Sequence, residues 1–164
     1  MEPKWAHPKY LIAGVGTRIH GSRWMPRGVA SAVYAASTEA IALKEARHNF
    51  SRYGIQPRQK PRVLVEVDLR LSAVVALPAL VEALPGIVLA ELLAESWEAV
   101  NDRDSESLSQ ALGRCLWDLG YEGLRVTSAR DARGQNLVWF PDRLRPGSSA
   151  SICGEEELNR WIAT

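Results

Sequence analysis

The chain contains little that would place it in one of the special classes of protein. Its 164 residues include only two cysteines, too few for a disulfide framework or a cysteine-based metal site. The longest apolar stretch, residues 71–93, is interrupted by prolines and glutamates. The first ten residues lack the apolar core of a signal peptide. We therefore expect a cytoplasmic protein without a membrane span and without a bound metal.

Charge of one sign is also scarce. Twenty basic and nineteen acidic side chains leave a formal net charge of +1, and this balance argues against a dominant nucleic-acid surface. Apolar residues make up 46% of the chain, which is typical of a globular protein that buries a substantial core. We expect one domain over residues 1–164 and no direct binding of nucleic acid.

Familiar catalytic motifs are missing as well. The sequence has no GxSxG, no HExxH and no Walker motif. Gly14-Val15-Gly16 is only superficially similar to a dinucleotide-binding turn, because the third glycine is misplaced and no strong strand and helix surround it. The sequence therefore argues against a Rossmann domain.

The pattern of apolar residues predicts a mixture of strands and helices. We expect strands at residues 31–36, 63–69, 124–127, 136–140 and 150–153, and helices at residues 38–50, 105–119 and 155–162, with short helices after Pro78 and Gly86. Because no regular βαβ alternation appears, the fold class is predicted as α+β, with a mixed central sheet and flanking helices.

The helix over residues 105–119 shows the clearest apolar stripe. Gly120 is placed to end this helix. The stripe predicts that Cys115 is a buried thiol. Its members are Leu108, Ala111, Leu112, Cys115, Leu116 and Leu119.

Three residues with useful chemistry stand at equal intervals. Arg23, Tyr34 and Glu45 are separated by eleven residues each. In a Gly-rich loop, Arg23 is suited to binding a phosphate bidentately, with Arg18 and Arg27 as further candidates. Tyr34, on a short strand, is either a core residue or a ring that stacks on a planar ligand. These residues suggest a pocket for an anionic ligand.

Glu45 lies on a helix face where an apolar residue is expected. A lone buried carboxylate is costly, so Glu45 either forms an ion pair with Arg23 or His48 or serves as a catalytic acid. Ser128 follows a short strand and is either a turn-forming hydroxyl or part of a pocket. The residues themselves leave these alternatives open.

Four pieces of the chain, in this order, resemble the RES domain family. GVGTRIHGSRW (residues 14–24) resembles the family's Gly-rich stretch ending in GGRW, and AVYAASTEAIALKE (32–45) resembles its tyrosine strand and acid-bearing helix. SLSQALGRCLWDLGYEGLRVTSAR (107–130) resembles its later helix, glycine turn and serine-bearing strand, and NLVWFPDRL (136–144) its closing strand. Because four pieces match in order, the chain is identified as a member of this family.

The resemblance implies both a fold and an activity. It implies a fold similar to that of ADP-ribosyltransferase toxins and a role as the toxin of a bacterial type II toxin–antitoxin pair, with an Xre-type antitoxin as partner. It implies that NAD+ is consumed as a substrate, with no cofactor, by hydrolysis, phosphorolysis or ADP-ribosyl transfer. We expect exposed apolar residues of the segment 74–93 to help assemble the complex, as a homo-oligomer or a hetero-oligomer with the antitoxin.

The resemblance also assigns roles to individual residues. Glu45 would stabilise an oxocarbenium-like transition state, Arg23 would clamp the pyrophosphate, and Tyr34 would position the nicotinamide side. Ser128 would form a hydrogen bond in the pocket. Arg18 remains a further candidate for an anion contact from its residue type alone.

Three positions depart from the family pattern. Lys4 stands where the family has an early arginine, and it keeps the charge but loses the bidentate fork. Ser22 replaces the family's second glycine, and Met25 replaces an asparagine. They keep a second hypothesis open, a catalytically weak RES-like module that sequesters a nucleotide or a protein partner. A third is a nucleic-acid-binding domain that uses Arg18, Arg23 and Arg27.

Overall fold

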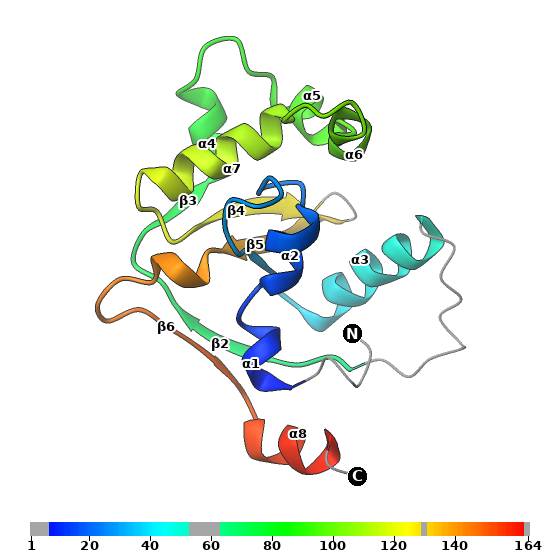
Figure 1. The fold of residues 1–164 in the computed structure, drawn as a ribbon, viewed down its shortest axis with the longest axis vertical. Coiled ribbons are helices and arrows are strands. Elements are labelled where there is room, and N and C mark those ends of the chain that lie inside the picture. Colours follow the sequence, from blue (N-terminus) through cyan, green and yellow to red (C-terminus); the bar gives the residue numbers. More distant parts are fainter. Residues whose placement is uncertain (1–6, 53–62, 129–130, 163–164) are drawn as a thin grey trace.

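The computed structural model of the chain describes residues 7–52, 63–128 and 131–162. Helices and strands are intermixed along the chain (Figure 1). The helices are α1 (Pro8–Leu11), α2 (Val15–His20), α3 (Glu39–Arg52), α4 (Leu77–Glu82), α5 (Leu89–Ala94), α6 (Trp97–Asn101), α7 (Leu108–Asp118) and α8 (Glu155–Ile162), with a 3₁₀ helix at Pro141–Arg143. The strands are β1 (Val33–Ala36), β2 (Val67–Arg70), β3 (Val74–Ala76), β4 (Gly123–Ser128), β5 (Asp131–Trp139) and β6 (Ser149–Ile152).

The central sheet is mixed. Its four strands have the order β1-β5-β4-β3, and the parallel pair β3–β4 adjoins the antiparallel pairs β4–β5 and β5–β1. Strands β2 and β6 form a separate antiparallel pair. Helices α4 and α7 pack on β4, and α3 packs along β1 and β5. The predicted α+β class, with a mixed sheet and flanking helices, is confirmed.

Strand register decides which side chains share a face of the sheet. Val138 of β5 stands opposite Tyr34 of β1 and Leu124 of β4, and Asn136 stands opposite Val126 of β4. Directly paired residues project from the same face, as do residues two apart along one strand. Because Leu124, Val126 and Val138 are all buried in the hydrophobic core, Tyr34 and Asn136 project from the core-facing side.

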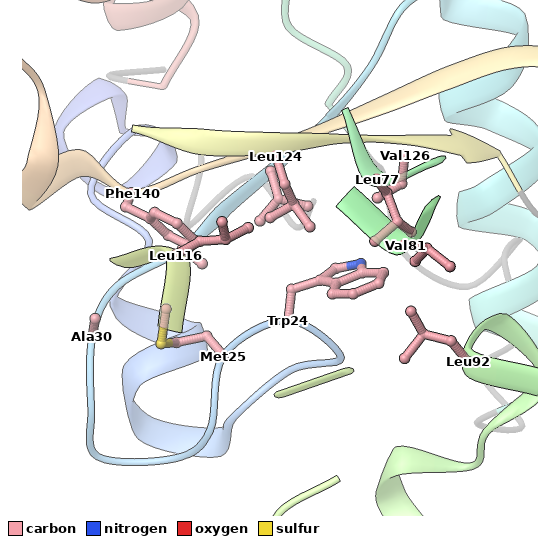
Figure 2. Packing of buried hydrophobic residues seen from close by; sticks show 12 residues of the cluster. Trp24, Met25, Ala30, Leu77, Val81, Leu92, Leu116, Leu124, Val126 and Phe140 are labelled. Atoms are coloured by element: carbon pink, nitrogen blue, oxygen red, sulfur yellow. The ribbon is translucent and has the colours of Figure 1, made fainter. Parts of the chain in front are cut away.

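The core gathers around Trp24, which is only 2% exposed (Figure 2). Its indole lies among aliphatic side chains of the sheet and of the helices on this face. Burying side chains of this size stabilises the fold by about 1.5–3 kcal/mol each. Trp24 and Met25 thereby anchor the loop that carries Arg23. The cluster comprises Trp24, Met25, Ala30, Ala32, Leu77, Val81, Leu92, Leu116, Leu124, Val126, Val138 and Phe140.

Helix α7 is turned relative to the predicted stripe. Cys115 is exposed, so the prediction of a buried thiol was wrong, and Leu119 is 72% exposed. The buried face carries Ser109, Gln110, Gly113 and Leu116 instead. This face is favoured because Gly113 permits close backbone contact with the Trp24 loop, and because hydrogen bonds satisfy the polar side chains. The periodicity of apolar residues could not report either effect.

Several boundaries differ from those expected. Strand β2 begins only at Val67, although inward and outward residues already alternate from Val63. Helices α1, α2 and α6 were not predicted. The helix expected after Thr38 is confirmed, and the Thr38 hydroxyl accepts a hydrogen bond from the Ile41 amide at 3.3 Å.

The apolar segment 74–93 mostly faces inward. Leu77, Val81 and Leu92 belong to the core, whereas Val88 is 52% exposed. The predicted role of the exposed apolar residues of this segment in assembly stays a prediction. Of the helices in the described ranges, none has the length and apolar character needed to cross a membrane.

Candidate functional site

The closest contact between predicted site residues joins α3 to the end of β4. The Ser128 hydroxyl donates a hydrogen bond to Glu45 Oε1 at 2.6 Å, although the two residues are 83 positions apart in the sequence. Asn136 Nδ2 donates to the same oxygen at 2.8 Å. Two donors on one oxygen fix the position of the carboxyl group. Glu45 is thus held by these hydrogen bonds, and no ion pair with Arg23 forms among the described side chains. The other predicted partner, the side chain of His48, lies outside the described part of the structure.

Local structure places each of these three groups. A shift of register between Thr127 and Ser128 marks an irregularity at the end of β4, and such bulges re-aim side chains. Ser37, just before α3, donates its amide to the Gln135 carbonyl at 2.8 Å. It also accepts from the Gln135 amide through its hydroxyl at 3.2 Å. These two bonds fix the start of α3 against β5, next to Asn136.

Tyr34 combines a fixed hydroxyl with an accessible side chain. Its hydroxyl donates to Ser22 Oγ at 2.7 Å and accepts from the Trp24 amide at 3.1 Å. Burial of the hydroxyl raises the pKa of Tyr34 to about 12, although its hydrogen bonds and the nearby Arg23 charge favour the ionised form. The residue as a whole is nevertheless 43% exposed. Tyr34 therefore tethers the Arg23 loop through its hydroxyl, while part of the residue remains exposed.

Arg23 extends from that loop toward α5 and α7. Its Nη1 donates to the Leu92 carbonyl at 3.4 Å. Its charge acts on the carboxylate of Glu95. Burial disfavours ionisation of Glu95, but hydrogen bonds from the Leu108 and Ser109 amides, together with Arg23, lower its pKa. The guanidinium is thus half-buried near both a carboxylate and a tyrosine hydroxyl.

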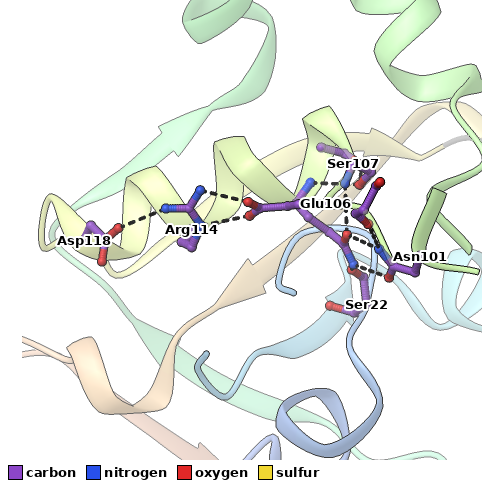
Figure 3. A network of polar contacts seen from close by, with 9 residues as sticks. Ser22, Asn101, Glu106, Ser107, Arg114 and Asp118 are labelled. Atoms are coloured by element: carbon purple, nitrogen blue, oxygen red, sulfur yellow. Dashed lines mark hydrogen bonds and ion pairs between the residues drawn. The ribbon is translucent and has the colours of Figure 1, made fainter. Parts of the chain in front are cut away.

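Helix α7 supports the Arg23 loop through hydrogen bonds, which belong to the network shown in Figure 3. The side-chain amide of Gln110, which is fully buried, donates to the Ser22 carbonyl at 2.9 Å and to Asn101 at 2.8 Å. Its oxygen accepts from Asn101 and from the Ser107 amide. Because all of these groups are paired, the network is rigid. It determines where the loop presents Arg23.

The remaining candidates lie apart from this arrangement. Lys4 is outside the described residues. Arg18 and Arg27 are exposed, and Arg18 lies in the last turn of α2, where its carbonyl accepts from the Gly28 amide at 2.9 Å. Ser22 does not require a positive φ, because among the described residues only Asp104 combines a positive φ with a side chain. Its replacement of glycine is therefore compatible with the loop.

A cleft of about 1180 Å³ opens mainly on the opposite face of the sheet. Among its lining residues are Val33, Leu69, Arg125, Leu137 and Trp139. The side chains of Val33, Arg125, Leu137 and Trp139 alternate with those of Tyr34 and Asn136 along their strands. Tyr34 and Asn136 also line this cleft, so it adjoins the candidate site, although Glu45 and Ser128 are not among its lining residues.

Comparison with known protein families confirms the resemblance. A family model described as the RES domain matches residues 3–160. The chain belongs to the RES domain family. No curated protein sequence matches this RES-domain chain significantly.

The RES-domain chain is also similar to a chain in the crystal structure of the M. tuberculosis MbcT–MbcA toxin–antitoxin complex. The two are 23% identical, and the match covers 92% of this chain and 81% of that chain with a TM-score of 0.65. At this identity the similarity shows the fold alone.

Sequence reasoning missed two groups of this RES domain. Asn136 was read only as the start of a strand, and Gln110 as part of a helix. A signal for Asn136 existed, because it precedes Leu137, Val138, Trp139 and Phe140, a run of apolar residues. A polar residue at the edge of such a run often marks a site, whereas the inward position of Gln110 depends on the rotation of α7.

Proposed function

We propose that this RES-domain protein is the toxin of a bacterial type II toxin–antitoxin pair and cleaves the nicotinamide–ribose bond of NAD+. The observation that carries the proposal is the 2.6 Å contact between Ser128 and Glu45. It places a hydrogen-bonded carboxylate at the end of the sheet face that also carries Tyr34. The toxin–antitoxin complex among the similar structures supports the same reading.

In the proposed reaction, the bond between ribose C1′ and the nicotinamide nitrogen breaks. The electron pair stays on that nitrogen, so nicotinamide leaves as a neutral molecule and needs no general acid. Positive charge develops on C1′ and the ring oxygen, and the Glu45 carboxylate stabilises it. A nucleophilic atom of water, phosphate or a protein side chain then bonds to C1′, and a proton that this atom carries passes to the solvent.

Arg23 and Tyr34 are proposed to hold the substrate. The Arg23 guanidinium would bind the pyrophosphate, whose charge suits its planar set of donors. The accessible ring of Tyr34 would contact the nicotinamide side, since its hydroxyl is already engaged by Ser22 and Trp24. Ser128 acts through Glu45, because its hydroxyl donates to the carboxylate.

The proposal also includes the binding partners of the protein and its location in the cell. We propose an Xre-type antitoxin as the protein partner, in the cytoplasm, with NAD+ as substrate and no separate cofactor. Neither a direct nucleic-acid contact nor a membrane contact is part of the proposal. Among the described residues, no three His, Cys, Asp or Glu side chains gather as possible metal ligands.

The test is NAD+ loss and nicotinamide release by the purified protein, with and without inorganic phosphate. The matched variant is Glu45→Gln, which keeps the shape of the side chain and removes its charge. We expect turnover by the wild type and a loss of at least about 100-fold in E45Q. Dependence of the rate on phosphate would identify the acceptor.

Turnover that is equal in the wild type and E45Q would contradict the role of Glu45. Absence of turnover in both, with NAD+ binding retained, would favour the alternative of a RES-like module that sequesters a nucleotide or protein. Adding candidate acceptor proteins separates that outcome from ADP-ribosyl transfer to an absent target.

A further inference from the structure

The contacts of Asn136 differ from those of an ordinary structural amide. Its Nδ2 donates to Glu45 Oε1 at 2.8 Å, while its Oδ1 is buried without a hydrogen-bond partner in the described part of the chain. A buried amide oxygen without a donor destabilises the fold, and natural proteins keep few such groups. An asparagine that served only stability would not be left in this state.

The position of Asn136 explains the unpaired oxygen. Rotating the amide by half a turn would bring Oδ1 against the Glu45 carboxylate, and two acceptors repel each other. The orientation observed satisfies the carboxylate at the expense of the amide oxygen. Stability is thus given up at the point where the proposed reaction needs an oriented charge.

The two donors also differentiate the oxygens of the carboxylate. Ser128 and Asn136 both donate to Oε1, and among the side chains that the structure describes none donates to Oε2. Because Oε1 is held from β4 and from β5, rotation of the carboxylate is restricted. Oε2 is then the oxygen left to face the ribose.

We propose that Asn136 is a positioning residue for the reaction, which holds Glu45 so that Oε2 faces the developing positive charge. The inference rests on the proposed NAD+ cleavage and adds to it a residue outside the family's arginine, tyrosine, glutamate and serine positions. Asn136 acts through Glu45, and its own contact with substrate is not required. Removing it therefore lowers turnover and leaves substrate binding and folding nearly unchanged.

The experiment compares Asn136→Leu with Gln135→Leu. Both replace an amide by an apolar side chain on β5, but Gln135 lies on the opposite face and its side chain is exposed. For N136L we expect kcat to fall by about 10- to 100-fold, KM to stay within about twofold, and Tm to equal or exceed that of Q135L. Asn136→Asp, which keeps the shape but not the donor, should lose kcat similarly.

The results separate this inference from the proposed function. If the wild type consumes NAD+ and N136L keeps its kcat, or loses activity only together with Tm, Asn136 is structural and the inference is wrong. If the wild type is inactive, NAD+ cleavage itself fails. In that case NMR tests the contact through the side-chain amide proton signals of Asn136, compared between the wild type and Glu45→Ala. A shift of these signals in the variant supports the contact, and unchanged signals overturn it.

Discussion

The backbone of Gly113 in α7 lies directly against the carbonyl of Trp24. A Cβ added at Gly113 would stand 1.8 Å from the Trp24 carbonyl oxygen, far inside van der Waals contact. Through this contact α7 supports the loop that contains Trp24 and its neighbour Arg23. The contact links the packing of the core to the placement of a candidate ligand-binding side chain.

Gly113→Ala should therefore destabilise the protein by about 1–3 kcal/mol or more, because the new Cβ would clash with the backbone carbonyl of Trp24, which no side-chain rotation can move away. It should also raise KM for NAD+, since the Arg23 loop must move. Urea unfolding and steady-state kinetics measure the two effects. The control is Gly16→Ala in α2, where nothing lies within 4 Å of the new Cβ, so stability should hold or rise slightly. Equal stability of the two variants would contradict the packing argument.

Ser128→Ala should lower kcat by about 10-fold, because the carboxylate of Glu45 loses one of its two donors. Since Ser128 acts through Glu45, the double variant S128A/E45Q should be no slower than E45Q alone. Rates of nicotinamide release from the four proteins measure this coupling. Ser151→Ala, at an exposed position of β6, serves as the control. If the loss of rate in the double variant equals the product of the losses in the two single variants, Ser128 acts independently of Glu45.

Tyr34→Phe and Tyr34→Ala should separate the hydroxyl from the ring. Phe leaves the Trp24 amide without its acceptor, so stability should fall by about 1 kcal/mol while KM for NAD+ changes little. Ala also removes the ring and should raise KM. Because the pKa of Tyr34 is raised from 10.0 to about 12, its contribution to stability is present below pH 10 and is lost between pH 10 and 12. Wild-type stability should therefore fall more steeply than that of Y34F over this range.

Glu122 should be important for stability and unimportant for catalysis. It is fully buried, and it accepts from the Ser72 and Ala73 amides at 2.6 and 2.7 Å and from the Arg145 amide at 2.8 Å. Burial disfavours its ionisation, but these bonds lower its pKa from 4.5 to about 2. Glu122→Gln should cost about 1–3 kcal/mol at neutral pH, because it leaves buried donors without acceptors.

The stability that Glu122 contributes depends on pH. Since the pKa is lowered on folding, the stabilisation is present above about pH 4.5 and is lost as the pH falls toward 2. The gap in unfolding free energy between wild type and E122Q should therefore narrow over that range. The control is Glu82→Gln at an exposed position, expected within about 0.5 kcal/mol at all pH values. A constant gap for E122Q would rule out this account.

Local patterns predicted the elements that depend on nearby residues. The helix after Thr38, the strand around Val126 and the terminal helix all appear, because caps, alternation and turn glycines act over a few residues. The inward face of α7 was predicted incorrectly at Cys115. That face depends on Gly113 meeting Trp24, two residues 89 positions apart.

The sequence by itself determined the α+β class, the family and the candidate residues Arg23, Tyr34, Glu45 and Ser128, because ordered motifs and local periodicity are written in the chain. Only the tertiary structure decided that Ser128 and Asn136 share one oxygen of Glu45, and that Tyr34 is tethered to Ser22. These relations depend on strand register and helix rotation. Both are set by packing among segments distant in sequence, which no local pattern encodes.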